Sequence, residues 1–185
     1  MDEYGPLPSF KYFHDPLAAG SFKLDPDTPC LGCNRIRGYI YTGPVYTEKN
    51  FILQDHLCPW CIADGSAARQ FGASFNDAGM MDGVPEAVMK EIEERTPGFE
   101  SWQGAGWLSC CDDAARFLGL AGSAELKRDF PGAIPAVMEI LSDDYGYSGK
   151  EQKEFFDSLS KDGQPTAYVF QCLHCKGYLA SVDQA

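Results

Sequence analysis

Hydrophobic positions in the first third of the chain fall in short runs that proline and glycine separate. Such a pattern favours short strands and loops over long helices. Residues 38–42 and 45–47 are rich in β-branched and aromatic side chains, and they flank the turn pair Gly43 and Pro44. These two runs therefore predict a β-hairpin.

The middle of the chain follows a helical period instead. Val84, Val88 and Ile92 recur at four-residue steps, Pro85 suits a first helical turn, and Thr96 ends the pattern. Further helices are predicted at 62–71, from 111 or 112 to 118, at 135–141, and after a capping box formed by Ser148 and Glu151.

Strand-like runs return near the end of the chain, where residues 167–170 and 178–180 enclose a Cys-x-x-Cys turn. We expect an α+β fold in a single domain spanning 1–185, because no repeat or linker divides the chain. Within it the pattern predicts a zinc-ribbon-like segment over 24–64, a mainly helical segment over 65–160 and a knuckle hairpin over 165–182.

Length and composition fit a globular domain that lies in the cytoplasm. The 185 residues are 44% hydrophobic, which is enough for one full core. No run approaches the roughly 18 apolar residues of a membrane-spanning helix, so membrane insertion is not expected. The start of the sequence lacks the basic residues and apolar run of a secretory signal, which favours a cytoplasmic location.

Charge narrows the choice of partners. The formal net charge is −12, from 15 Lys and Arg residues against 27 Asp and Glu. Nucleic-acid-binding proteins carry a basic surface that neutralises phosphates, and none is evident here. We therefore expect no nucleic-acid partner and favour a protein partner of basic charge.

Eight cysteines carry the most specific chemistry of the sequence, and six of them form three Cys-x-x-Cys pairs. In a reducing compartment such pairs indicate metal or thiol chemistry rather than disulfides. The first two pairs, Cys30 with Cys33 and Cys58 with Cys61, predict one structural Zn²⁺ held by four thiolates. A redox-active dithiol at Cys58 and Cys61 is the competing interpretation.

A second metal site is predicted from the remaining cysteines. Cys172 and Cys175 form a knuckle, and we expect Gly177 to supply the positive φ that closes it. The ligand set is complete if Cys110 and Cys111 join them, although adjacent residues reach one ion only at the frayed start of a helix. His56, His174 or Asp112 could replace Cys110 or Cys111 as a ligand. The alternative is that this region supplies one ligand or none.

Several segments resemble a known family, the CbrC-like colicin-tolerance family of bacterial cysteine-rich proteins. The resemblance rests on residues 7–12, 15–17, 20–22, 37–46, 57–67 and 95–99, with Trp102 and Gln103. The family pattern has His-Cys where this chain has Cys110 and Cys111, and both residue types bind zinc. The resemblance implies a bacterial cytoplasmic protein linked to tolerance of a protein toxin, and it supplies no catalytic residue.

These features favour a non-catalytic zinc-binding protein that binds a protein partner, for which a basic toxin domain is one candidate. Most of six aromatic residues near the predicted metal region are expected in the core, and a subset at the surface beside acidic residues would suit a protein partner: Tyr39, Tyr41, Tyr46, Trp60, Trp102 and Trp107. The alternative is a zinc-dependent hydrolytic enzyme with an open coordination position near Cys110 and Cys175, assisted by Asp112 or His174. A nucleic-acid-binding zinc ribbon has the wrong charge and ranks last.

Overall fold

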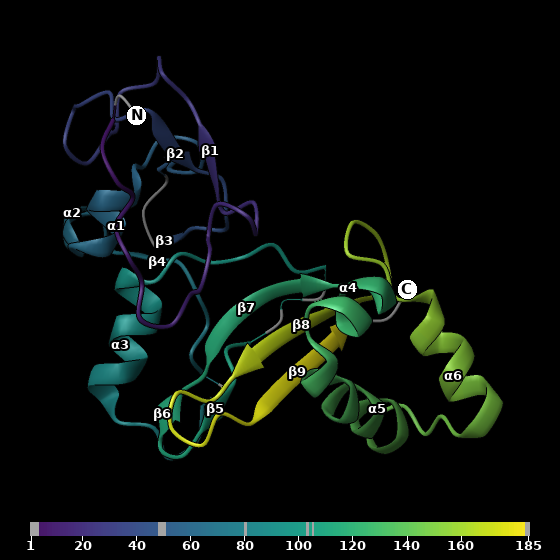
Figure 1. Cartoon of the computed structure of the whole chain (residues 1–185). Coiled ribbons are helices and arrows are strands. Elements are labelled where there is room, and N and C mark those ends of the chain that lie inside the picture. The colour runs from purple at the N-terminus through teal and green to yellow at the C-terminus, as the bar shows by residue number, and fades with distance from the viewer. Residues whose placement is uncertain (1–3, 48–50, 80, 103, 105, 184–185) are drawn as a thin grey trace.

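The computed structural model describes residues 4–47, 51–79, 81–102, 104 and 106–183. Short strands and helices fill the first part, and the longer elements follow (Figure 1). In chain order they are β1 (Phe22–Leu24), β2 (Tyr39–Tyr41), β3 (Tyr46–Thr47), α1 (Pro59–Ala63), α2 (Ser66–Phe71), β4 (Ala73–Ser74), α3 (Glu86–Arg95), β5 (Ser109–Cys110), β6 (Asp113–Ala114), β7 (Arg116–Ala121), α4 (Ser123–Arg128), η1 (Pro131–Ala133), α5 (Ile134–Asp143), α6 (Gly149–Ser158), β8 (Thr166–Gln171) and β9 (Tyr178–Asp183).

A three-stranded antiparallel sheet in the order β7–β8–β9 forms the centre of the molecule (Figure 1). Phe117 lies opposite Phe170, which in turn lies opposite Leu179. Since successive side chains of a strand point to opposite faces, the sheet separates two hydrophobic cores. Phe117 and Phe170 belong to one core, whereas Val169 belongs to the other.

The first core is aromatic and includes much of the N-terminal half. The ring of Phe99 stacks on that of Phe117 with centroids 4.0 Å apart, and Trp107 meets Phe170 edge-on at 5.6 Å. The N-terminal segment pairs with the outer edge of β7, where the backbone N–H of Phe117 donates to the carbonyl of Tyr12 at 2.7 Å. This contact brings Tyr12 and its neighbours to the end of the sheet.

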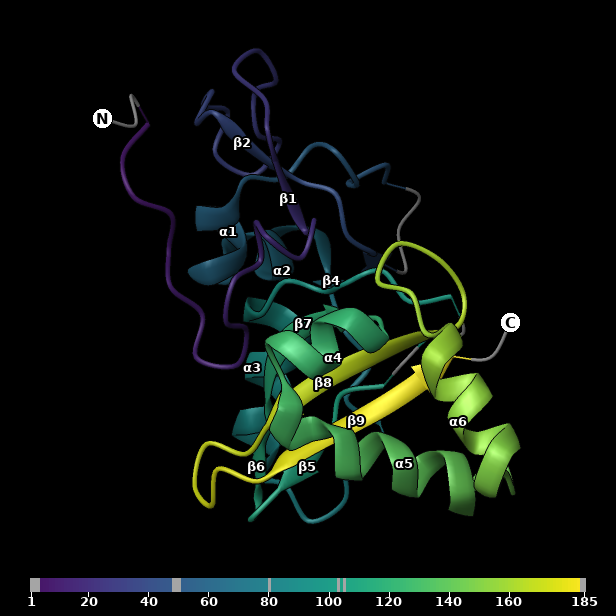
Figure 2. The same cartoon turned by 45° about the vertical axis from the view of Figure 1, so that its right-hand side comes forward.

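The second core lies on the other face of the sheet, where α5 and α6 pack away from β1 and α1 (Figure 2). Leu126, Val137 and Leu141 are fully buried there. In both views the β8–β9 turn lies beside β5 and β6 at one end of the sheet.

The α+β class is confirmed, with cysteine turns near both ends of the chain, and α3, α5, β8 and β9 form where the sequence predicts them. The predicted hairpin over residues 38–47 is wrong, because β2 pairs with β1 and β3 pairs with β4. The predicted helix 62–71 is divided into α1 and α2 by Asp64 and Gly65, the latter with a φ of 71°.

The predicted helix from 111 or 112 to 118 is also wrong. After β5, this stretch forms a two-residue turn, β6 and the start of β7. Burial alternates along β7, which is the period of a strand, and Gly119 lies inside that strand rather than beyond a helix. Helix α6 begins after Ser148 as predicted, but the Ser148 side chain makes no capping hydrogen bond.

Candidate metal centres

The first cysteine pair lies in the connection between β1 and β2. The backbone N–H of Asn34 donates to the carbonyl of Cys30 at 2.7 Å, and Asn34 has a φ of 54°. Pro29 and Ile36 bridge across the base of this turn. The tight turn points the two thiols of the pair in the same direction.

The second pair opens helix α1 rather than a second knuckle. Cys58 is the N-cap residue and keeps an extended backbone, Pro59 occupies the first turn, and Cys61 follows within it. Proline suits this position because its missing N–H would have no partner there. The first site therefore combines one cysteine turn with one helix N-terminus.

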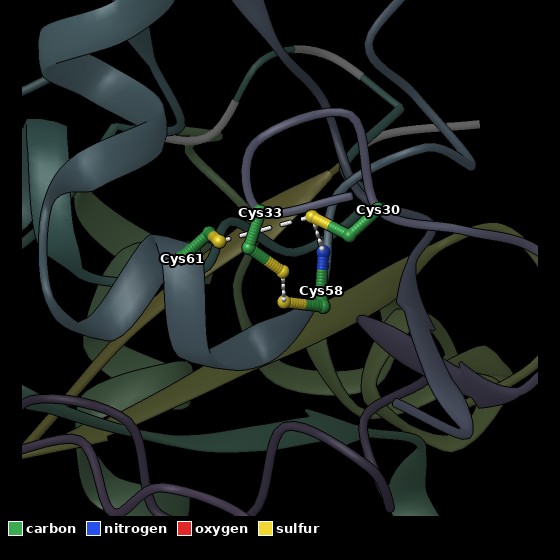
Figure 3. Close-up of side chains that lie close together, drawn as sticks. All are labelled: Cys30, Cys33, Cys58 and Cys61. Atoms are coloured by element: carbon green, nitrogen blue, oxygen red, sulfur yellow. Dashed lines mark hydrogen bonds between the residues drawn. The ribbon is translucent and has the colours of Figure 1, made fainter. Parts of the chain in front are cut away.

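The four thiols of this first tetrad, Cys30, Cys33, Cys58 and Cys61, point toward one another (Figure 3). The Sγ atoms of Cys30 and Cys61 are 3.8 Å apart, and those of Cys33 and Cys58 are 3.9 Å apart. A tetrahedron with metal–sulfur bonds of about 2.3 Å has edges of about 3.8 Å. Disulfide sulfurs lie at about 2.05 Å, so this spacing fits a shared metal ion and not disulfides.

The first tetrad is part of the aromatic core. Cys30, Cys58 and Cys61 are buried, and the backbone N–H of Cys58 donates to the Sγ of Cys30 at 3.2 Å. Gly32 passes close to the cluster, since a Cβ atom at that position would lie 3.1 Å from the Sγ of Cys61. The chain is packed tightly around this site.

The second tetrad joins two turns at one end of the central sheet. Cys110 ends β5, and Cys111 and Asp112 form a two-residue turn with φ values of 56° and 57°. Positive φ at both positions is the geometry of a type I′ hairpin turn. Cys172 and Cys175 lie in the β8–β9 turn, where the residue with positive φ is Lys176 and not the predicted Gly177.

The spacing of the second tetrad, Cys110, Cys111, Cys172 and Cys175, also fits one metal ion. The Sγ of Cys110 lies 3.6 Å from that of Cys111 and 3.7 Å from that of Cys175, and the four sulfurs lie within 4.8 Å of one another. A hairpin turn, rather than a frayed helix, lets the adjacent Cys110 and Cys111 meet. Cys172 is buried, whereas Cys111 and Cys175 are exposed.

Hydrogen bonds between the thiols lower the pKa of some cysteines and raise the pKa of others. Contacts with the Cys58 and Cys61 thiols hold the pKa of Cys30 far below its usual value, and the contact with Cys30 raises the pKa of Cys61 to about 12. In the second tetrad the contact with Cys172 raises the pKa of Cys110 to about 12. Metal binding must therefore displace protons from several thiols in each tetrad.

The buried carboxylate of Asp113 forms a hydrogen-bond network next to the second tetrad. The Oδ1 of Asp113 accepts a hydrogen bond from the Tyr12 hydroxyl at 2.7 Å, and its Oδ2 lies 2.9 Å from the Nε2 of His174 and 3.2 Å from the Nζ of Lys11. Asp113 is 7% exposed. These contacts connect the N-terminal segment to both turns that carry the cysteines.

The sequence analysis did not identify this role of Asp113. Lys11 and Tyr12 lie in one of the segments that carry the family resemblance, but no local pattern connects them to a residue about one hundred positions later. His56 and Asp112, considered as substitute ligands, do not join the four sulfurs of the second tetrad. The Nε2 of His174 faces Asp113 instead.

Two four-cysteine clusters of this geometry define a protein with two sites able to hold a metal ion. In the described part of the chain, no helix combines the length and the apolar character needed to cross a membrane. The chain belongs to the uncharacterised protein family UPF0167, whose model matches residues 7–184.

Relatives of similar length occur in two groups of bacteria. The chain is 46% identical to the UPF0167 proteins of Mycobacterium bovis and Mycobacterium tuberculosis over 181 residues, which is 97% of this chain and 94% of each relative. It is 41% identical to a UPF0167 protein of Pseudomonas aeruginosa over 172 residues, 92% of this chain and 93% of that protein. No solved structure is significantly similar. Toxin tolerance, implied by the resemblance to CbrC-like proteins, stays a prediction.

Proposed function

We propose that this protein is a non-catalytic zinc protein that binds two structural Zn²⁺ ions and a basic protein partner. The observation that carries the metal assignment is the spacing of the sulfurs, which fits tetrahedral coordination: two pairs in each tetrad lie 3.6 to 3.9 Å apart, and all four sulfurs of a tetrad lie within 4.8 Å of one another. Four thiolate ligands in a tetrahedron favour zinc or iron–sulfur chemistry. Zinc is the simpler assignment, because one ion fills each tetrad.

Each ion would connect two parts of the chain that are distant in the sequence. The first would join the β1–β2 connection to the start of α1 through Cys30, Cys33, Cys58 and Cys61. The second would join the β5–β6 turn to the β8–β9 turn through Cys110, Cys111, Cys172 and Cys175. All eight cysteines are free thiols, which suits the reducing cytoplasm that we propose as the location.

A closed coordination shell supports the non-catalytic assignment. A catalytic zinc keeps one position for water, whereas each tetrad offers four sulfur ligands. The hydrolytic alternative needs one cysteine of the second tetrad to leave the ion. We therefore favour the structural role at both sites.

Charge supports the choice of a basic protein as partner. The chain carries a formal charge of −12, and a Zn²⁺ ion with four thiolates would add to the negative field. Such a field accelerates the association of cationic proteins and repels nucleic acids. A cationic toxin domain is the partner that agrees with the resemblance to the colicin-tolerance family.

The metal assignment is tested by native mass spectrometry of protein purified under reducing conditions without added metal. We expect two zinc ions per chain and slow alkylation of all eight cysteines. One zinc ion, with rapid alkylation of the second tetrad, would restrict the proposal to the first site. Iron or no metal would overturn it. The partner assignment predicts association that slows as salt rises, and a rate that ionic strength leaves unchanged would contradict it.

A further inference from the structure

A cleft of about 1070 Å³ opens beside the aromatic core, away from both tetrads. None of the eight cysteines lines it within the described chain. Its lining comes from segments that are distant in the sequence: 19–20, 44, 46, 54, 74–77, 93, 99–102, 104, 107, 120 and 161–162. The volume is at the upper end of the range for ligand pockets, which is more than one side chain needs.

The cleft is lined by more negative than positive charge. Four carboxylates, those of Asp77, Glu93, Glu100 and Asp162, face it together with Lys161. Among the described residues, none of the four carboxylates forms an ion pair, although other acids of the protein do. Burial, and then the nearby charge of Asp77, raise the pKa of Glu93. A cation in the cleft would relieve this repulsion.

The floor of the cleft is fixed by hydrogen bonds. The backbone N–H of Phe75 donates to the carbonyl of Glu93 at 2.7 Å, and the side-chain amide of Asn76 donates to the carbonyl of Ile92 at 2.9 Å. These contacts hold the strand-to-loop segment 74–77 against α3. Asp77 and Glu93 therefore stand at defined positions, which reduces the entropy lost on binding.

Two exposed aromatic rings border the cleft. Trp102 is 66% exposed and Tyr46 is 53% exposed, whereas most other aromatic side chains near them are buried. The backbone N–H of Trp102 donates to the carboxylate of Asp183 at 2.9 Å, so the exposed ring stands on an anchored backbone. Aromatic faces beside carboxylates attract cations, and most strongly a planar guanidinium.

We propose that this cleft binds an arginine-bearing segment of the partner protein. The inference rests on the proposed function, because it assigns the surface that receives the basic partner. Arginine fits better than lysine, since a guanidinium pairs with a carboxylate through two hydrogen bonds and also stacks on aromatic rings. The volume of the cleft suits a segment of several residues rather than a single small cation.

The test is fluorescence anisotropy with a fluorescein-labelled peptide of three arginines separated by glycines. The metal-loaded full chain is compared with the double variant Asp77→Asn/Glu93→Gln and with Trp102→Ala. The matched control is Glu139→Gln/Glu151→Gln, which removes the same charge from exposed positions on α5 and α6. A peptide with citrulline in place of arginine keeps the shape and removes the positive charge. Circular dichroism checks that each variant is folded.

We expect the arginine peptide to bind, the citrulline peptide to bind poorly, and the cleft double variant to bind at least about tenfold more weakly than the control. Trp102→Ala should weaken binding by about threefold or more. Equal binding of the peptide to the cleft variants and to the control variant would overturn the cleft as the binding site. A basic partner would then have to bind elsewhere on the protein. Absence of binding to the unmodified chain would contradict the basic partner itself. If free argininamide displaces the labelled peptide as effectively as the unlabelled arginine peptide does, the cleft binds a small cation. That result would overturn the proposal that it binds a protein segment.

Discussion

The two cysteine tetrads contain the same four ligand atoms but lie in different surroundings. Three cysteines of the first tetrad are buried within the aromatic core, together with residues of α1 and β2. In the second tetrad one cysteine is buried and two are exposed. Identical chemistry thus serves two structural purposes: the first tetrad takes part in the hydrophobic core, and the second fastens two surface turns together.

The surroundings also differ in how the negative charge of the thiolates is compensated. In the first tetrad the Cys30 sulfur accepts a backbone hydrogen bond from Cys58 at 3.2 Å. In the second, the Cys172 and Cys175 sulfurs accept longer ones at 3.4 Å, from His174 and Gly177. Water has access to the exposed sulfurs of the second tetrad. Loss of metal should therefore be more costly at the buried site.

The largest effect is expected when a thiol of the buried tetrad is removed. Cys61→Ser or Cys33→Ser should abolish the native melting transition of the N-terminal third. A structural zinc site contributes apparent binding energy of about 10–16 kcal/mol, which equals or exceeds the whole stability of a typical domain. Thermal unfolding followed by circular dichroism, with zinc content measured on the same sample, is the test.

Cys175→Ser is the matched change in the exposed tetrad. It should lower the melting temperature and the affinity for the second zinc ion while the cooperative transition persists, because the aromatic core does not include Cys175. If Cys61→Ser melts like the unmodified protein, the structural role of the first tetrad is wrong. If both variants lose the transition, the two sites do not differ as their burial indicates.

The cysteine pairs show which parts of the sites a sequence can predict. Ligand spacing within Cys-x-x-Cys is local, so the pairs at 30, 58 and 172 were recognisable, and so was the knuckle between β8 and β9. The conformation of Cys110 and Cys111 was not, because a helix and a hairpin turn fit the same few residues. The strand period of β7 was obscured by the bulge between Phe117 and Gly119.

The sequence also did not predict which distant segments pair with one another. The run 38–42 contains β2 (Tyr39–Tyr41), as expected of its composition, but this strand pairs with β1 and not with the next run. Asp113 is one of 27 acidic residues, and its contacts with Tyr12 and Lys11 cross about one hundred positions. Such contacts depend on the whole fold, and local propensities carry no information about them.

A moderate effect is expected at the carboxylate that supports the exposed tetrad. Asp113→Asn keeps the size of the side chain but removes the negative charge that faces Lys11 and His174. It also removes one acceptor oxygen from the hydrogen-bond network that includes Tyr12. We expect a loss of about 1–3 kcal/mol in the free energy of unfolding, because the buried hydroxyl of Tyr12 loses its charged acceptor. Chemical denaturation of the zinc-loaded protein measures this change.

The adjacent Asp112 provides the control. It is exposed in the turn and has a φ of 57°, a conformation that asparagine adopts more readily than most residues. Asp112→Asn should therefore change stability by less than about 0.5 kcal/mol. Similar losses in both variants would mean that the charge of the turn matters, and not the contacts of Asp113.

The smallest effect is expected at the glycines that pass each tetrad. A methyl group at Gly32 would lie 3.1 Å from the Cys61 sulfur and 3.6 Å from the Cys30 sulfur, and at Gly177 it would lie 3.3 Å from the Cys175 sulfur. The buried sulfurs have no space to move, whereas Cys175 is exposed. Gly32→Ala should therefore cost about 1 kcal/mol, and Gly177→Ala less than about 0.5 kcal/mol.

Two measurements on the zinc-loaded glycine variants distinguish the effects at the two sites. They are the melting temperature and the rate at which zinc is released to a competing chelator. Gly32→Ala should release the ion of the first tetrad faster and lower the melting temperature. Gly177→Ala should alter release from the second tetrad alone. A larger loss for Gly177→Ala would show that the exposed tetrad is the more rigid of the two, and the assignment of the buried tetrad to the core would no longer explain the difference between them.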